Sequence, residues 1–240
     1  MSLETLVNLA NPAYPGFTNT KNELLRVTVT VRGSHGQIVT MALGELDPNF
    51  GNHPALLALT AGGLPIPGSP DLIVPGDRPP ARTIVGVSEV TVGIATAPAT
   101  TTDVTGALTI IDGRRQRTLS LRQLSALPQR TPSVTFAGPR GSQTHTETGP
   151  TLDEVLRAAG IPADLDTWVA GVGDDNYVAT VTPAEAWVGG RPPLVALVED
   201  GMRVSGTVGD TPRLIADGDV KGGRDDSDLV DLYVGRGPAS

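Results

Sequence analysis

The most informative absence in this sequence is cysteine, because its 240 residues contain none. Without a thiol the chain cannot form a disulfide, an iron–sulfur cluster, a thiolate metal site or a cysteine nucleophile. Histidine is scarce as well, and His35, His53 and His145 stand too far apart to form a ligand pair at helical or hairpin spacing. We therefore expect no protein-bound metal site.

Long apolar stretches are also missing. No window of 18 apolar residues occurs, and the first residues lack the basic region and apolar run of a signal peptide. We therefore expect neither a membrane span nor a signal peptide. The chain as it stands would be cytoplasmic, or extracytoplasmic if a leader or an anchor has been removed.

Positive charge is in deficit, with 18 Lys and Arg against 26 Asp and Glu and a net charge of -8. Such a balance repels phosphate backbones, so nucleic acid is excluded as a general partner. The one basic stretch of the chain holds five arginines, Arg114, Arg115, Arg117, Arg122 and Arg130. We interpret it as a solvated hairpin edge protected by charge, with a phosphate or acidic-partner surface as the less favoured alternative.

Glycine and proline are abundant, with 29 and 21 residues, while hydrophobic residues make up 39% of the chain. This composition favours short strands joined by tight turns around a real core and excludes an all-helical bundle. We expect an α+β, β-rich fold. The small, polar segment at residues 95–103 has no periodicity and is expected to be a linker between two units, residues 1–94 and 104–240.

Local patterns indicate the individual elements. Apolar and polar side chains alternate over Leu24–Val31 and Ile84–Val92, as in half-buried strands, and Asp112-Gly113 favours a type I′ hairpin turn. Three short helices are predicted by capping boxes, in which a Ser or Thr is followed three residues later by Glu or Gln. The three pairs are Ser120 with Gln123, Thr151 with Glu154, and Thr182 with Glu185.

The two units repeat each other in sequence. Leu56-Leu57-Ala58-Leu59 matches Leu194-Val195-Ala196-Leu197, and the block that starts at Pro70 aligns without a gap on the block that starts at Pro212. Residues 2–10 match residues 151–159 in type, position by position. The matched order predicts an internal duplication in which the first unit is a shorter copy without a counterpart of residues 104–150.

Several motifs of the second unit follow one another in a recognisable order. They are the strand, turn and helix of residues 107–134, the helix of residues 149–161 ending in Ala159-Gly160-Ile161, the loop Asp174-Asp175-Asn176-Tyr177, and the strand at residues 194–201 leading to Pro212-Arg213-Leu214-Ile215. This order resembles the oxidoreductase molybdopterin-binding domain of the sulfite oxidase family. The resemblance implies the fold of that domain for both units.

The resemblance also locates a candidate cofactor site. In the family's redox enzymes a cysteine after the Leu-Pro helix binds molybdenum, and Ala137 is the best match for that position here. The resemblance implies further pterin contacts at Arg140, His145, Asp175 and Tyr177. Because an alanine methyl group cannot bind a metal, we expect a degenerate site without bound molybdenum, although molybdopterin itself stays in question as a ligand.

Three functions follow from these features. The leading hypothesis is a non-redox binding or structural module for a pterin-like or other anionic small molecule or for a protein partner. The alternative is a molybdopterin-dependent oxidoreductase, or a subunit of one, that holds the cofactor without a cysteine ligand. A third hypothesis is an extracytoplasmic module of a larger, membrane-anchored protein. No catalytic residue is identified.

Two acidic turns are further candidates for a binding site. Residues 174–176 and 225–228 each gather several oxygen ligands that calcium would accept. Neither matches the spacing of a calcium-binding loop, so we interpret both as solvated turns.

Overall fold

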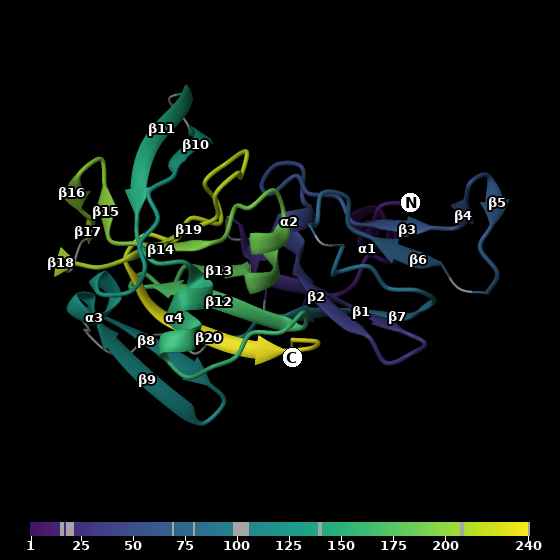
Figure 1. Ribbon diagram of the computed structural model, residues 1–240, viewed down its shortest axis with the longest axis horizontal. Coiled ribbons are helices and arrows are strands. Elements are labelled where there is room, and N and C mark those ends of the chain that lie inside the picture. Colours follow the sequence, from purple (N-terminus) through teal and green to yellow (C-terminus); the bar gives the residue numbers. More distant parts are fainter. Residues whose placement is uncertain are drawn as a thin grey trace.

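The computed structural model describes residues 1–14, 17, 22–68, 70–78, 80–97, 106–138, 141–206 and 209–239. It is rich in short β-strands and contains a few short helices, as the glycine and proline content predicts (Figure 1). Most of the expected linker, residues 98–103, lies outside the described residues. No helix of the described part is long and apolar enough to cross a membrane.

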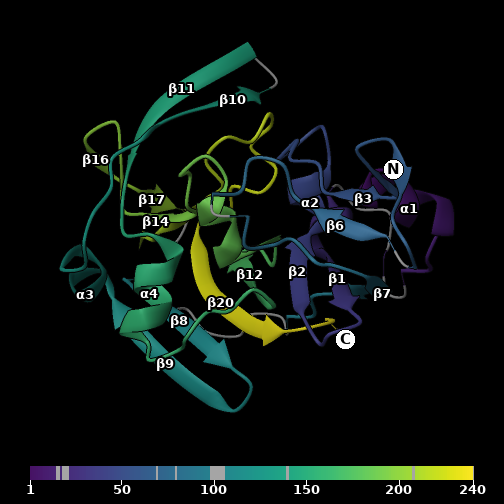
Figure 2. The same cartoon turned by 45° about the vertical axis from the view of Figure 1, so that its right-hand side comes forward.

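Two sheets form the centres of the two halves of the chain (Figure 2). The first has the order β2-β1-β7, with β1 Val27–Gly33, β2 Ile38–Ala42 and β7 Val87–Ile94. The second has the order β13-β12-β20-β8-β9, with β8 Ala107–Asp112, β9 Arg115–Ser120, β12 Thr167–Gly173, β13 Val178–Val181 and β20 Leu229–Arg236.

Smaller pairings surround these sheets. Beside the first lie β3 Leu56–Ala58 with β6 Asp71–Ile73, and β4 Thr60–Ala61 with β5 Leu64–Pro65. Beside the second lie β14 Leu194–Ala196 with β19 Arg213–Ile215, β17 Ser205–Gly206 with β18 Gly209–Asp210, and a sheet of β10 Ser133–Gly138, β11 Gly141–Thr148, β15 Val198–Glu199 and β16 Met202–Arg203. The helical segments are α1 Leu3–Ala10, η1 Glu23–Arg26, α2 Leu43–Leu46, α3 Leu121–Ser125, α4 Leu152–Ala158 and η2 Pro183–Trp187.

The two central sheets share one pairing scheme. In each, a middle strand pairs antiparallel on both sides, β1 with β2 and β7, and β12 with β13 and β20. The register shifts at the same place, after Arg32 in β1 and after Val172 in β12. The second sheet alone is extended, because β8 adds in parallel to β20 and β9 then pairs with β8.

Each central sheet has its own apolar core. Buried valines of β1 pack against Leu3 and Val7 of α1 and against Leu72, while β12 and β20 pack against Leu152 and Leu156 of α4. The apolar residues of both helices recur at spacings of three and four, so one face of each helix is buried. Burying such faces supplies most of the stability of helices this short.

Most of the expected elements form, with shifted ends. The first strand begins at Val27 and not at Leu24, because Glu23–Arg26 form a 3-10 turn, and the strand expected at Ile84 begins at Val87. The predicted hairpin exists, but Gly113 and Arg114 are its central residues and only Gly113 has a positive φ, 59°. One positive φ at the first central position fits a type II′ turn, which corrects the expected type I′.

The helix caps follow the sequence. The Ser120 and Gln123 side chains form the reciprocal capping box of α3, and the Thr151 hydroxyl accepts a hydrogen bond from the Glu154 N–H at the start of α4. The third predicted helix is a 3-10 segment, η2. Its five residues close a tight turn, which suits the 3-10 form.

Two buried arginines occupy matching places in the two halves. Arg82 donates to both oxygens of Asp77, at 2.8 Å each, and to Glu45 at 2.7 Å. Arg224 donates to both oxygens of Asp219, at 2.6 and 2.8 Å, and to Glu185 at 2.7 Å. A guanidinium is well suited to this bidentate geometry, which lowers the cost of burying its charge.

The halves contact each other beside these ion groups. The residue after Asp77, Arg78, donates its N–H to the carbonyl of Trp187, at 3.2 Å. The residue after Asp219, Val220, donates likewise to the carbonyl of Phe50, at 2.8 Å. In the first bond the first half donates and the second accepts, and in the second bond the roles are reversed. Each half therefore has a loop that is hydrogen-bonded to the other half.

Candidate ligand cavity

A cavity of about 1050 Å³ lies where loops of both halves meet. The first half contributes Asn22 and Phe50, and the second contributes β10, the loop after β12 and residues 221–228. Pockets for small ligands commonly hold several hundred cubic ångströms and lie between structural units. The size and position of this cavity are therefore suitable for a small molecule.

Two glycines bring aromatic rings to the cavity wall. A Cβ atom at Gly222 would lie 3.1 Å from the Phe136 ring, and one at Gly223 would lie 2.3 Å from the Phe50 ring. Any larger residue would push these rings aside. The aromatic rings thus pack directly against the backbone of the loop, one from each half of the chain.

Tyr177 connects the loop after β12 to its surroundings. Its hydroxyl donates to the carbonyl of Gly223 and accepts a hydrogen bond from the Asn22 side chain at 3.0 Å. Burial raises the pKa of this phenol. The hydroxyl therefore stays protonated at neutral pH and joins three segments that line the cavity.

The least expected residue of the cavity is Asp226. Its side chain is 1% exposed, and its Oδ2 atom has no hydrogen-bond partner among the described residues. Burial, followed by the charges of Asp175 and Asp228, raises its pKa well above the usual value of a carboxyl group. The prediction that residues 225–228 are solvated is wrong at this position, because the backbone of Asp226 bridges to Leu214 and this pairing carries the side chain inward.

Three further aspartates surround Asp226 in the cavity wall. Asp225 accepts a hydrogen bond from the Ala216 N–H at 2.9 Å, and burial raises its pKa to about 7. Asp175 accepts from the Tyr177 N–H, and Asp228 from the Thr211 hydroxyl. Lys221 is the only basic residue in the described wall, and its ammonium group already donates to Asn49 at 2.9 Å. The cavity is therefore acidic.

The structure brings three of the five predicted site residues to this cavity. Ala137, Asp175 and Tyr177 line it. His145 does not; it lies on β11, where its Nδ1 atom is 2.9 Å from Asp200. Arg140 lies outside the described residues.

His145 belongs to a neighbouring charged cluster. The hydrogen bond to Asp200 and the nearby carboxylate of Glu199 raise the pKa of His145. Its ring stacks on Phe136 at 6.0 Å between ring centres. The histidine thus supports one aromatic wall of the cavity from behind, and it does not face the interior.

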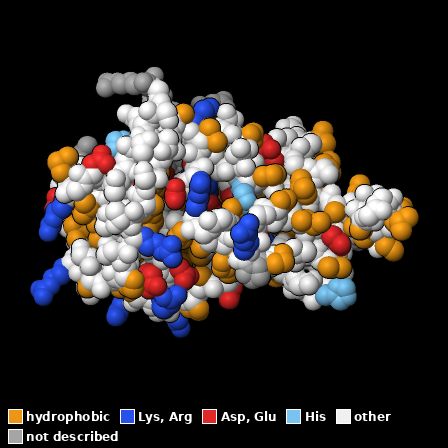
Figure 3. Space-filling view, turned by 45° about the horizontal axis from the view of Figure 1, so that its top comes forward, with side chains coloured by type: hydrophobic (Ala, Val, Ile, Leu, Met, Phe, Trp, Pro, Cys, Tyr) orange, Lys and Arg blue, Asp and Glu red, His pale blue; other side chains and the backbone are white. Residues whose placement is uncertain are grey.

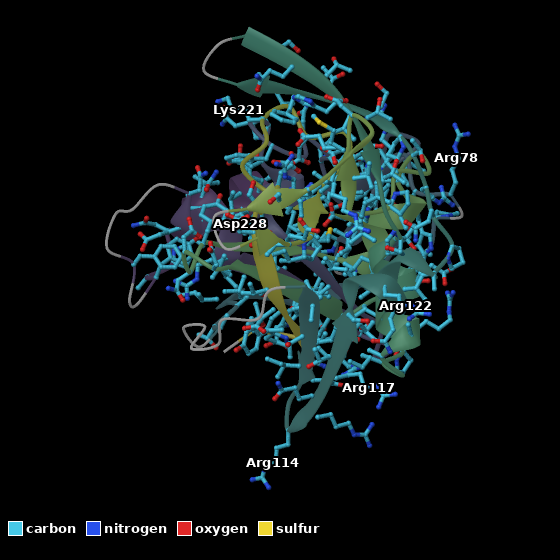
Figure 4. All side chains as sticks on the ribbon, turned by 90° about the vertical axis from the view of Figure 1, so that its left-hand side faces the viewer. Arg78, Arg114, Arg117, Arg122, Lys221 and Asp228 are labelled. Carbon is cyan, nitrogen blue, oxygen red and sulfur yellow. The ribbon has the colours of Figure 1, made fainter. Side chains whose placement is uncertain are left out.

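The basic stretch lies apart from the cavity. Figure 4 shows Arg114, Arg117 and Arg122 along the β8–β9 hairpin and its end, in the lower and right-hand part of the view, while Asp228 lies near the middle and Lys221 at the upper left. This position agrees with a solvated hairpin edge. Across the described ranges, no group of three His, Asp or Glu side chains is placed to hold a metal ion.

Sequence reasoning missed Phe50, Asn22 and the burial of Asp226. A signal for the last was present, because the gapless alignment of Pro70 on Pro212 pairs Ile84 with Asp226. Ile84 is fully buried and bridges to Leu72 as Asp226 bridges to Leu214. The second half thus has a carboxyl group where the first half has a core isoleucine.

Comparisons with known proteins identify no family for this chain. No protein-family model matches the chain, and no curated protein matches it. Among solved structures, the chain is similar to the sulfane dehydrogenase SoxCD from Paracoccus pantotrophus, with a TM-score of 0.44 and 13% sequence identity. The match covers 74% of this chain and 50% of the SoxCD chain, so the similar region spans half the length of that protein.

Proposed function

We propose that the chain consists of two molybdopterin-domain-like units that arose by duplication, residues 1–94 and 104–240. The shared pairing scheme, the register shift at the same position and the two arginine-carboxylate groups support this proposal. The arginine follows the aspartate by five positions in each group, Asp77 to Arg82 and Asp219 to Arg224. A common origin of the two units accounts for both the shared strand pairing and the shared ion group.

We further propose that the second unit is a non-redox binding module for a small, flat heterocycle of the pterin type. Asp226 carries this proposal, since it is one of the lining residues, stands in place of an isoleucine, and its buried Oδ2 atom has no hydrogen-bond partner among the described residues. A buried polar atom without a partner costs about 1–3 kcal/mol. Groups that cost stability in this way are concentrated at functional sites.

The chemistry of the wall favours the ring of such a ligand. A pterin presents adjacent amino and ring N–H donors along one edge, and aspartate oxygens accept such donors. Phe50 and Phe136 offer apolar surface for the faces of a flat ring. Lys221 is the only basic residue of the described wall and already donates to Asn49, so we propose that the heterocycle, and not an anionic tail, is recognised.

The same residues do not fit a molybdenum cofactor. Ala137, at the position that the resemblance gives to the metal-binding cysteine, contributes a methyl group to the wall. The described wall also offers the cofactor's phosphate a single basic residue, Lys221, which already donates to Asn49. For these reasons we propose binding without redox chemistry, in preference to an oxidoreductase that holds the cofactor without a thiolate.

The test is a fluorescence titration of the intact chain with 6-hydroxymethylpterin and with its monophosphate. We expect the phosphate-free pterin to bind more tightly, and Asp226→Asn to weaken its binding at least tenfold. Asp153→Asn, an exposed substitution on α4, is the matched control and leaves binding unchanged. Equal binding by the natural chain and Asp226→Asn would refute the proposed site.

Elemental analysis separates the two functions. Protein purified from its own host is analysed for molybdenum and, after denaturation, for pterin fluorescence. We expect no stoichiometric molybdenum. One molybdenum per chain would overturn the non-redox proposal and support the oxidoreductase.

A further inference from the structure

The matching strand pairs β3–β6 and β14–β19 differ in how well their outer faces are covered. Leu56 faces Ile73 in the first pair, as Leu194 faces Ile215 in the second. Leu194 and Ile215 are at most 1% exposed, whereas Leu56 is 37% and Ile73 41% exposed. The outer face is therefore buried in one unit and open to solvent in the other.

Strand β10 explains the difference. Its residues Val134 and Phe136 form one apolar cluster with Leu194, Ala196 and Ile215. No described residue plays this part for the face of β3–β6, since the first unit has no counterpart of residues 104–150. The chain itself thus shows what kind of segment covers such a face.

The strand edge next to this face shows the same contrast. In the second unit the N–H of Leu197 donates to Thr148 of β11 at 2.8 Å, and in the first unit the matching N–H of Leu59 has no partner among the described residues. The hairpins are otherwise alike, because the carbonyls of Leu59 and Leu197 each accept from the residue seven positions later, Ile66 or Val204. Leu59 is 63% exposed and Leu197 only 9%.

The pairing in the first unit stops one step before Leu59. Leu57 donates to the carbonyl of Met1 at 2.8 Å, as Val195 donates to that of Pro150 at 2.9 Å. In the second unit the next donor along the edge is Leu197. A strand that continued this edge in the first unit would accept from Leu59 in the same register.

We infer that the face of Leu56 and Ile73, together with the edge at Leu59, is a docking surface for a β-hairpin of a partner protein. One strand of the hairpin would pair antiparallel with the edge at Leu59, as β11 does at Leu197, and the other would lay apolar side chains on the face, as Val134 and Phe136 of β10 do in the second unit. Adding a strand to an open edge is a common mode of peptide recognition.

The charge of the surface indicates the chemistry of the partner strand. Residues 54–70 contain no Asp, Glu, Lys or Arg, and neither does β10. Figure 3 shows hydrophobic side chains gathered at this end of the molecule. An uncharged strand with alternating apolar residues suits the surface, whereas an anionic lipid surface would be met by Lys and Arg around the apolar face.

Amide exchange of the intact chain, followed by NMR, tests this inference. The probe is a synthetic peptide of residues 131–150, which carries the sequence of the β10–β11 hairpin. At saturating peptide we expect exchange of the Leu59 N–H to slow at least tenfold. Ile73→Arg weakens peptide binding at least tenfold, and Leu9→Arg, an equally large change at an exposed leucine of α1, leaves it unchanged.

A fusion protein tests the same inference in case the free peptide does not fold. Residues 104–149 are joined ahead of Met1, so that the hairpin is held close to the surface at high effective concentration. We expect the Leu59 N–H to exchange at least tenfold more slowly in this chain without added peptide. If neither peptide nor fusion slows this exchange, the inference is wrong.

Two other results would assign the surface to a different occupant and overturn the inference. One is protection of Leu59 that rises with protein concentration alone, together with a dimer in sedimentation that Ile73→Arg abolishes. The other is protection of Leu59 by vesicles of phosphatidylcholine and phosphatidylglycerol. Neither result affects the proposed pterin site, whose described wall includes no residue of β3 or β6.

Discussion

Replacing Asp226 by isoleucine is expected to stabilise the protein while removing its ligand site. The substitution introduces the residue that stands at the matching place in the first unit, Ile84. It also removes a buried oxygen that has no hydrogen-bond partner in the described part of the chain, among apolar neighbours that include Leu214 and Leu229. Replacement of a buried ionisable group by a well-packed apolar residue is often stabilising by about 1–4 kcal/mol.

The expected magnitude follows from two opposing contributions. Removing the unpartnered carboxyl recovers about 1–3 kcal/mol, and burying the isoleucine adds about 1.5–3 kcal/mol. Overpacking against Gly173, whose Cβ position lies 2.8 Å from the Asp226 Oδ1 atom, offsets about 1–3 kcal/mol of this gain. We expect a net stabilisation of about 2 kcal/mol, which for a chain of this length raises Tm by roughly 4 °C.

The gain should depend on pH. Because burial raises the pKa of Asp226, the folded state keeps a proton that the unfolded state releases above about pH 4. The free energy of unfolding of the natural chain therefore falls as the pH rises, by about 1.4 kcal/mol per pH unit from this group, until the pH reaches its folded pKa. Asp226→Ile lacks this contribution, so its advantage is larger at pH 8 than at pH 4.5.

Urea denaturation followed by circular dichroism at these two pH values measures both effects. Asp226→Asn is the control of matched size, which removes the titration without filling the site. A stabilisation by Asp226→Ile that is equal at pH 4.5 and pH 8 would contradict the assigned protonation. Destabilisation by more than about 2 kcal/mol at both pH values would show that the side chain is a necessary structural partner.

The remaining predictions concern the ion groups and the tyrosine. Arg82→Met and Arg224→Met each leave buried carboxylates unpaired and should lower the free energy of unfolding by about 3–5 kcal/mol in urea denaturation. The control Arg157→Met, at an exposed arginine, should change it by less than about 1 kcal/mol. A loss as small as that of the control would contradict the role of Arg82 and Arg224 in neutralising the buried carboxylates. Burial raises the pKa of Glu185 to about 7, so the folded natural chain holds a proton that the unfolded chain releases at lower pH. The free energy of unfolding of the natural chain should therefore fall between pH 5 and pH 8 more steeply than that of Glu185→Gln. Parallel pH profiles of the two proteins would contradict this. Tyr177→Phe removes two hydrogen bonds and should cost about 1–2 kcal/mol in the same assay; no loss would show that these bonds add nothing.

The local elements were the most predictable part of the fold. Ser120 and Thr151 start helices because their hydroxyls accept from backbone N–H groups three residues later, an interaction contained in a few neighbouring residues. The turn at Gly113 was predictable for the same reason. Its type was wrong, because the strand register sets which residues become central.

The candidate site was predictable only in part. Ala137, Asp175 and Tyr177 line one cavity, but Phe50 and Asn22 come from the other half of the chain. Nothing near them in sequence marks them, because they reach the cavity through contacts between the halves. Asp226 looked like one of several turn aspartates, and its burial follows from the strand register at Leu214.

The sequence by itself determined the β-rich composition, the caps and turns, and the repeated blocks of the two halves. These depend on side-chain periodicity and on hydrogen bonds between near neighbours, which each segment carries within itself. Only the tertiary structure decided that Asp226 is buried, that two arginines each join a pair of carboxylates, and that one apolar face is covered while its counterpart is open. Burial and pairing depend on which distant segments pack together, and no single segment contains that information.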